Sequence, residues 1–135
     1  MSKPANRTLK PAGRCILLRL THFASFDYIL SVAVLNSFRD LSQLFSEVGR
    51  IIRDDGIFSF TVEEPEPGQP DDYAINRVNV SEQPEADSAV TLYRHTSDYI
   101  AQLLNNNNFV LCKSLKFVAF RYPAENRDVF FKAYI

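Results

Sequence analysis

Residues 26–64, FDYILSVAVLNSFRDLSQLFSEVGRIIRDDGIFSFTVEE, decide the fold, because they hold two strand-like runs around one helical pattern. Residues 28–34 form a nearly unbroken apolar run, typical of a parallel strand that is covered on both faces. Residues 56–62 form a second run of this kind. Between the two runs, apolar residues recur at spacings of three and four: Leu41, Leu44, Phe45, Val48, Ile51 and Ile52. The segment therefore predicts a βαβ unit with two parallel strands.

The ends of this unit are also marked in the sequence. Asp40 precedes the helical periodicity and can accept hydrogen bonds from the free N–H groups of the first turn. Asp54-Asp55-Gly56 predicts a turn between the helix and the second strand. In open sheets of this kind, ligands bind beyond the carboxyl ends of the strands. A site is therefore expected around residues 33–38 and 62–65.

Length and composition indicate one globular domain. The chain has 135 residues, of which 46% are hydrophobic and 23% are charged. We expect a flexible arm over residues 1–13 and a single domain over residues 14–135. The net charge of −1 gives no electrostatic footprint for nucleic acid or for an anionic membrane. No run approaches the eighteen apolar residues of a membrane helix, so we expect a soluble, cytoplasmic protein.

The two cysteines, Cys15 and Cys112, have no metal or redox spacing. A reduced, intracellular protein is the simpler interpretation. His22 has no partner ligand at useful spacing, so no metal site is expected.

The rest of the chain predicts a helix and an antiparallel hairpin. Residues 63–88 are rich in proline and acidic residues, which predicts a long acidic loop, either an active-site cover or a solvated insertion. After a short extended segment at 90–93, Thr96 or Ser97 is placed to cap a helix with an apolar stripe, which ends at asparagines 105–108. Three strand patterns complete the chain, over residues 14–20, 109–121 and 129–135, and the last two form a hairpin.

A family resemblance follows from these residues. The run FDYILSVAVL, then Phe38, Asp40-Leu41, the amphipathic helix, the Asp-Asp-Gly turn and IFSFT, resembles the second half of a class I S-adenosylmethionine-dependent methyltransferase. The order of the later elements agrees, so the resemblance covers residues 26–135. It implies an α/β fold with an incomplete Rossmann-like methyltransferase sheet, in which a parallel βαβ unit precedes a helix and an antiparallel C-terminal hairpin.

The sequence departs from this family at its cofactor loop. Members bind the cofactor mainly through a glycine-rich loop after the first strand, whereas the glycines here are widely separated: Gly13, Gly49, Gly56 and Gly68. Only 25 residues precede Phe26, so the first three strands of the family are absent. We expect that one copy of this chain cannot form an intact methyltransferase site.

The resemblance implies half of a site. Five residues would lie beneath the methionine part of S-adenosylmethionine: Ser31, Ala33, Val34, Leu35 and Asn36. Tyr93, Arg94 and His95 would approach the substrate. The alternatives are core packing for residues 33–35 and a polar residue before a helix for His95. Glu63 and Glu64 could act as an acid–base pair, or could simply be solvated.

The missing strands have a physical consequence, because the strand over residues 28–34 becomes an apolar sheet edge. Either residues 14–20 fold back beside it, or two chains meet there as a dimer. Three functions follow. The chain is a truncated or degenerate methyltransferase-like protein without independent activity, which acts as a dimerisation or regulatory partner of a complete methyltransferase. Alternatively, it is an active methyltransferase whose site is completed by oligomerisation, or a protein-binding module that uses the acidic loop.

Overall fold

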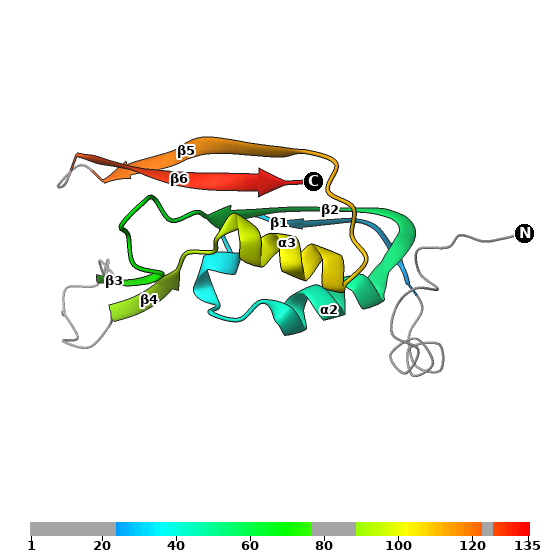
Figure 1. Cartoon of the computed structure of the whole chain (residues 1–135). Coiled ribbons are helices and arrows are strands. Elements are labelled where there is room, and N and C mark those ends of the chain that lie inside the picture. Colours follow the sequence, from blue (N-terminus) through cyan, green and yellow to red (C-terminus); the bar gives the residue numbers. More distant parts are fainter. Residues whose placement is uncertain (1–23, 77–88, 123–125) are drawn as a thin grey trace, which may run out of the picture.

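The computed structural model describes residues 24–76, 89–122 and 126–135. The expected arm, the strand over 14–20, Cys15, His22, loop residues 77–88 and part of the last turn lie outside the described residues. The elements, drawn in Figure 1, are β1 (Phe26–Ser31), η2 (Leu35–Ser37), α2 (Ser42–Ile51), β2 (Ile52–Glu63), β3 (Asp72–Asn76), β4 (Ala89–Tyr93), α3 (Ser97–Asn106), β5 (Ser114–Tyr122) and β6 (Arg127–Tyr134).

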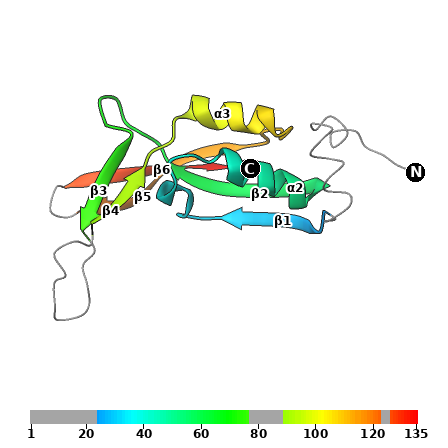
Figure 2. The same cartoon turned by 90° about the horizontal axis from the view of Figure 1, so that it is seen from below.

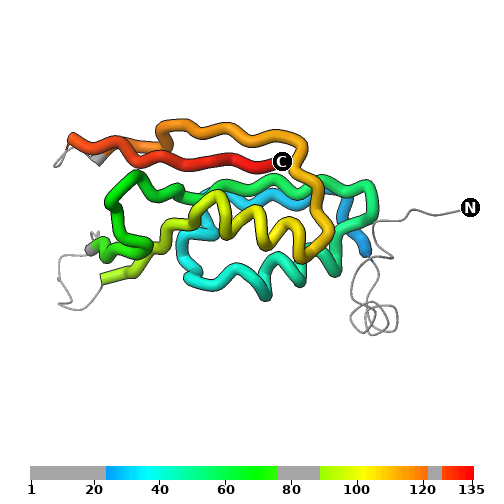
Figure 3. The backbone as a smooth tube through the Cα atoms, viewed as in Figure 1, coloured from blue at the N-terminus to red at the C-terminus, as the bar shows by residue number. Residues whose placement is uncertain are grey.

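The predicted βαβ unit and C-terminal hairpin are confirmed. One four-stranded sheet has the order β1-β2-β6-β5, in which β1 and β2 are parallel. Strand β6 lies between β2 and β5 and is antiparallel to both of them (Figure 3). Strands β3 and β4 form a separate antiparallel pair, which lies beyond the carboxyl ends of β1 and β2 (Figures 1 and 2).

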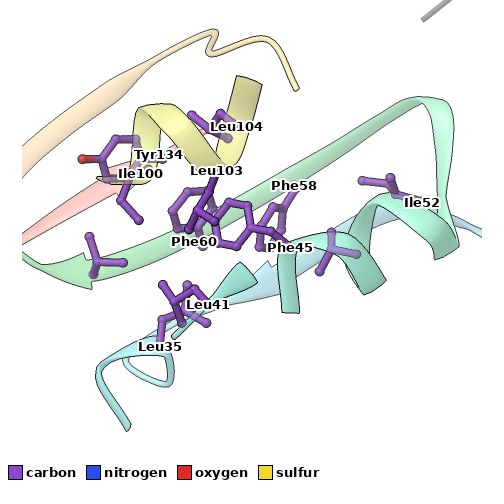
Figure 4. Close-up of a cluster of buried hydrophobic side chains, with 12 residues drawn as sticks. Leu35, Leu41, Phe45, Ile52, Phe58, Phe60, Ile100, Leu103, Leu104 and Tyr134 are labelled. Atoms are coloured by element: carbon purple, nitrogen blue, oxygen red, sulfur yellow. The ribbon is translucent and has the colours of Figure 1, made fainter. Parts of the chain in front are cut away.

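Both helices cover the same face of the sheet, because their apolar stripes meet alternate residues of β2. Phe45 of α2 makes edge contacts with Phe58 and Phe60, with ring centroids 5.5 and 5.2 Å apart. Phe60 also stacks on Tyr134 of β6 at 5.1 Å. Around these rings lie the other buried members of the core: Leu35, Leu41, Val48, Ile52, Val62, Ile100, Leu103 and Leu104 (Figure 4). This core ties the hairpin to the βαβ unit.

The opposite face of the sheet is apolar and exposed. Residues that alternate with the core positions point to this face, and register pairs Tyr28 with Ile57 across β1 and β2. Tyr28 is 75% exposed and Leu30 is 73% exposed. We call this surface the open face and define it by Tyr28, Leu30, Ile57, Leu115 and Phe117, all of them exposed. In the part of the chain that the structure describes, no helix covers it.

Three sequence expectations about element boundaries were wrong. Residues 54–56 form no turn between elements, because α2 passes directly into β2 and the register jumps from Phe26–Ile52 to Tyr28–Ile57. The acidic loop contains β3, which pairs with β4. The third error is the early start predicted for the strand at 109.

The early start at residue 109 failed because Phe109 packs into the core. Asn108 adopts a φ of 59°, which turns the chain after α3, as the asparagine run predicted. Phe109 then approaches Phe45 and Phe58, at centroid distances of 6.5 and 5.9 Å. Regular strand pairing consequently begins only at Ser114.

Candidate functional site

The turn after β1 lies where the sequence predicted a site. Ala33 has a φ of 56°, in the left-handed region that residues with a Cβ avoid. Its N–H donates to the Thr61 side-chain oxygen at 2.9 Å, which ties the turn to β2. The short helix η2 follows immediately. The carboxyl ends of the two parallel strands are therefore fixed to each other by a side chain.

The five predicted cofactor residues divide into a buried and an accessible set. Leu35 is fully buried in the core and Asn36 is also buried, so the core-packing interpretation holds for Leu35. Ala33 and Val34 are exposed and Ser31 is partly exposed. The accessible part of this segment is thus its backbone and the small side chains before η2.

Glu63 is buried in an ion pair, so the expectation of a solvated carboxylate was wrong for it. Arg94 Nε lies 2.9 Å from Glu63 Oε1, and both side chains are almost fully buried. Tyr73 donates its hydroxyl to Glu63 Oε2 at 2.5 Å, and the Arg94 guanidinium lies 4.1 Å from the centre of the Tyr73 ring. Arg94 Nη1 donates to Pro70 O at 2.8 Å. Strands β2, β3 and β4 therefore meet at one satisfied polar cluster.

His95 joins this cluster to the predicted cofactor segment. Its Nε2 lies 3.2 Å from Leu35 O, and its ring stacks on Tyr99 at 5.7 Å. Burial lowers the pKa of His95, against the opposing influence of the Leu35 and Phe38 carbonyls and of Asp71. The structure thus brings the two predicted groups of site residues together, with His95 as the contact between them.

Tyr99 and Asp40 form the next layer. The Tyr99 hydroxyl donates to Asp40 Oδ1 at 3.1 Å and accepts from Leu41 N at 2.9 Å. Burial raises the pKa of Tyr99. Asp40 also accepts from Ser42 N at 2.8 Å, as predicted for the start of α2, and hydrogen bonds from Ser42 lower the pKa of Asp40.

These groups line a cleft of about 600 Å³ beyond the carboxyl ends of β1 and β2. We call it the polar cleft. It is lined by Arg39, Asp40, Asp71, Asp72, Tyr93, Arg94, His95, Thr96 and Tyr99. Arg39 lies 3.0 Å from Asp72 across its mouth and 5.4 Å from the Tyr93 ring centre. The cleft can hold a polar molecule against carboxylates, a phenol and an imidazole.

Sequence reasoning missed part of this lining. Asp71 and Asp72 were counted only as loop residues, and Tyr99 only as a member of an apolar stripe. The available signal was a tyrosine at the margin of that stripe, since a buried phenol needs a hydrogen-bond partner. Nothing in the spacing of residues placed Glu63 beside Arg94.

Within residues 24–76, 89–122 and 126–135, no three His, Cys, Asp or Glu side chains gather as a metal site. No helix among these residues has the length and apolar character required to span a membrane.

Comparison with known proteins agrees with this arrangement. The sequence profile of a family described as "Methyltransferase domain" matches residues 18–60. A solved SAM-dependent methyltransferase from Methanosarcina mazei superposes with a TM-score of 0.63 at 12% identity, over 99% of this chain and 64% of that chain. The chain has a class I methyltransferase fold. It resembles a fragment of such a methyltransferase and spans less than two thirds of the length of this one.

A second solved methyltransferase is more distant. The glycopeptide N-methyltransferase MtfA, in complex with (S)-adenosyl-L-methionine, matches with a TM-score of 0.48 at 9% identity, over 99% of this chain and 59% of that chain. No curated protein matches the sequence. The methyltransferase resemblance therefore rests on the family profile and on the fold.

Proposed function

We propose that this chain supplies the second half of a class I methyltransferase site and has no independent activity. The observation that carries the proposal is the turn at Ala33, which Thr61 holds at the carboxyl end of β1, next to the polar cleft. Open parallel sheets bind ligands at this edge. On the cysteine usage of the sequence, we place the protein in the cytoplasm.

The residues present fit one side of S-adenosylmethionine. Ser31, Ala33 and Val34 offer accessible backbone and small side chains for the methionine part. Among the described residues, Gly49 lies in α2, Gly56 in β2 and Gly68 in a separate turn, so none forms a glycine-rich cofactor loop. When bound, the cofactor would supply an electrophilic methyl group. The polar cleft would hold the acceptor, with neutral His95 facing Leu35.

The uncovered open face calls for a partner, and we propose a second copy of this chain. Each large apolar side chain that faces water raises the free energy of the monomer, by roughly 25 cal/mol per Å² of exposed apolar surface. The open face gathers five of them, on β1, β2 and β5. Association through this surface would remove them from water and bring two half-sites into one particle.

The acidic-loop alternative receives less support. Three of the loop carboxylates are engaged within the chain: Glu63 pairs with Arg94, Glu66 lies 2.5 Å from Lys116 Nζ, and Glu64 also lies near cations. Glu64 lies between Lys116 and Lys132, at 3.8 and 3.7 Å. A basic partner would have to displace these cations.

The experiment combines analytical ultracentrifugation with S-adenosylhomocysteine titration of the same sample. We expect self-association at micromolar concentration, and a monomer after Leu30→Lys, which places a charge on the open face. Ligand at a hundredfold excess over its dissociation constant would stabilise a competent site by about 2.7 kcal/mol. The Leu30→Lys monomer should show no such shift in its melting temperature.

Two results would overturn the proposal. A wild-type protein that stays monomeric contradicts the second copy as partner. Binding of S-adenosylhomocysteine by the Leu30→Lys monomer contradicts the half-site, since one chain would then be sufficient.

A further inference from the structure

The mouth of the polar cleft already holds a cation, which comes from the chain itself. Asp72 of β3 lies directly opposite Tyr93 of β4, so the two side chains project from the same face of this strand pair (Figure 2). The Arg39 guanidinium lies 3.0 Å from the Asp72 carboxylate and 5.4 Å from the centre of the Tyr93 ring. A carboxylate beside an aromatic face attracts cations. We call Asp72 and Tyr93 the cation seat.

Arg39 is held in the cation seat only weakly. The Arg39 side chain is 75% exposed, and the Asp72 side chain is 45% exposed. An ion pair this open to water contributes little to stability, because solvent screens both charges and because the long side chain must be ordered. Another cation can therefore take the place of Arg39.

Both arginines that line the polar cleft already have a carboxylate of their own. The Arg94 guanidinium is paired with Glu63. Arg39 is paired with Asp72. Among the residues that the structure describes, these pairs leave no unmatched cation in the lining to attract an anionic ligand.

Two further carboxylates give the cleft a negative potential. Asp40 accepts hydrogen bonds from Ser42 N and from the Tyr99 hydroxyl. These donors are neutral, so the charge of Asp40 is not cancelled. Asp71 also lines the cleft, and neither it nor Asp40 has a cationic partner in the described part of the chain. The potential therefore favours a cationic ligand over an anionic one.

His95 offers such a ligand a hydrogen-bond acceptor. Its Nε2 lies 3.2 Å from Leu35 O, and its ring lines the cleft. A carbonyl oxygen can only accept, so Nε2 of the neutral ring carries the proton and Nδ1 carries a lone pair. Burial lowers the pKa of His95 and so favours this neutral form. A ligand that donates N–H groups suits this wall of the cleft.

We propose that the polar cleft binds a molecule that carries a protonated amine, with the ammonium group on the cation seat in place of Arg39. The ammonium donates to Asp72 and lies over the Tyr93 ring, while Asp40 and Asp71 supply the surrounding negative potential. That this molecule is the methyl acceptor rests on the proposed function. The binding itself uses the residues of one chain and needs neither the cofactor nor self-association.

The test titrates benzylammonium into the ¹⁵N-labelled full chain and follows the amide chemical shifts. Benzyl alcohol, which is neutral and has nearly the same shape, is the control ligand. We expect saturable shifts at Asp72, Tyr93 and Thr96 with benzylammonium. Benzyl alcohol should bind at least about tenfold more weakly, because its hydroxyl carries no charge.

Two variants with the same change of charge make the test sharper. Arg39→Gln removes the competing cation from the seat and should tighten benzylammonium binding about threefold or more. Arg53→Gln removes an equal charge at the amino end of β2, beside Asp27, and should leave binding unchanged. Tyr93→Leu keeps an apolar side chain in the seat without the ring face, and should weaken binding about threefold.

Three results would overturn the proposal. Equal affinity for benzylammonium and benzyl alcohol would mean that the cleft selects the ring and not the charge. Equal tightening in Arg39→Gln and Arg53→Gln would show attraction by net charge alone. Shifts confined to residues 28–30 would place the ligand on the open face.

Failure of the proposed function gives a different pattern. A wild-type chain that binds benzylammonium but neither self-associates nor binds S-adenosylhomocysteine would support the cation seat and contradict the half-site. A chain that binds S-adenosylhomocysteine and ignores benzylammonium would contradict the cation seat alone.

Discussion

At the scale of single residues, the Glu63–Arg94 pair has the largest expected effect on stability. Removing one partner of a buried ion pair leaves an uncompensated charge, which costs about 3–5 kcal/mol. We predict that Arg94→Met lowers the free energy of unfolding by this amount, measured by urea denaturation. The matched control is Arg39→Met, which breaks the exposed pair with Asp72 and should cost less than about 1 kcal/mol. Equal losses in the two variants would contradict the structural role of the buried pair.

His95 gives the stability a pH dependence. Burial lowers the pKa of His95 in the folded state below its ordinary value, so the unfolded chain binds more protons in the window between the two values. The contribution of the neutral imidazole is therefore fully present above about pH 6.5 and is lost as pH falls through the folded pKa. Asp71 and the Leu35 and Phe38 carbonyls oppose this shift.

The measurement is the midpoint of urea unfolding from pH 8 to pH 5. We predict that wild type loses stability across this range more steeply than His95→Gln. A His95→Gln curve parallel to wild type would exclude His95 as the source.

At the scale of elements, the contact between β1 and β2 depends on Gly56. A Cβ at this position would lie 2.6 Å from Ile52 Cγ1 and 3.1 Å from the carbonyl oxygens of Phe26 and Asp27. We predict that Gly56→Ala costs about 1–3 kcal/mol, because overpacking shifts the backbone. Asp55→Ala, at the exposed neighbouring position, should stay within about 0.5 kcal/mol of wild type. Melting curves of the two variants test this prediction. A Gly56→Ala protein with the melting temperature of wild type would contradict it.

The sequence predicted those elements that have a regular pattern of apolar residues of their own. The stripes of α2 and α3, the apolar run of β1 and the hydrogen-bonding side chains of Asp40 and Thr96 were readable for this reason. Strand β3 was not, because its residues are held by pairing with β4 and by the Tyr73 contact with Glu63.

Gly56 was misread for a related reason. Its residue type suggested a turn, whereas its function in β2 is to allow the close approach of the β1 backbone. In the site, the sequence indicated which edge of the sheet to examine. It did not indicate that the Arg94 side chain is held in a buried ion pair with Glu63, or that Tyr99 and Asp71 line the polar cleft.

At the scale of the whole molecule, the proposed association of two copies through the open face predicts a weak dependence on salt. Association through apolar side chains depends little on salt, whereas association through exposed charges weakens as salt screens them. We predict that sedimentation equilibrium gives nearly the same dimer dissociation constant at 0.05 and 0.5 M NaCl. A constant that rises tenfold or more with salt would point to charged surfaces instead of the open face.

Because β6 lies between β2 and β5, the four-stranded sheet can form only after β6 has been synthesised. Strand β5 is made before β6, yet its neighbour in the sheet is β6. As the polypeptide leaves the ribosome, β1 can pair with β2 at once. The aromatic side chains of β5 stay exposed until β6 has been made. Domains exposed in this way are open to misassembly until the missing strand arrives. Strand β6, Arg127–Tyr134, thus joins the βαβ unit and β5 into one sheet.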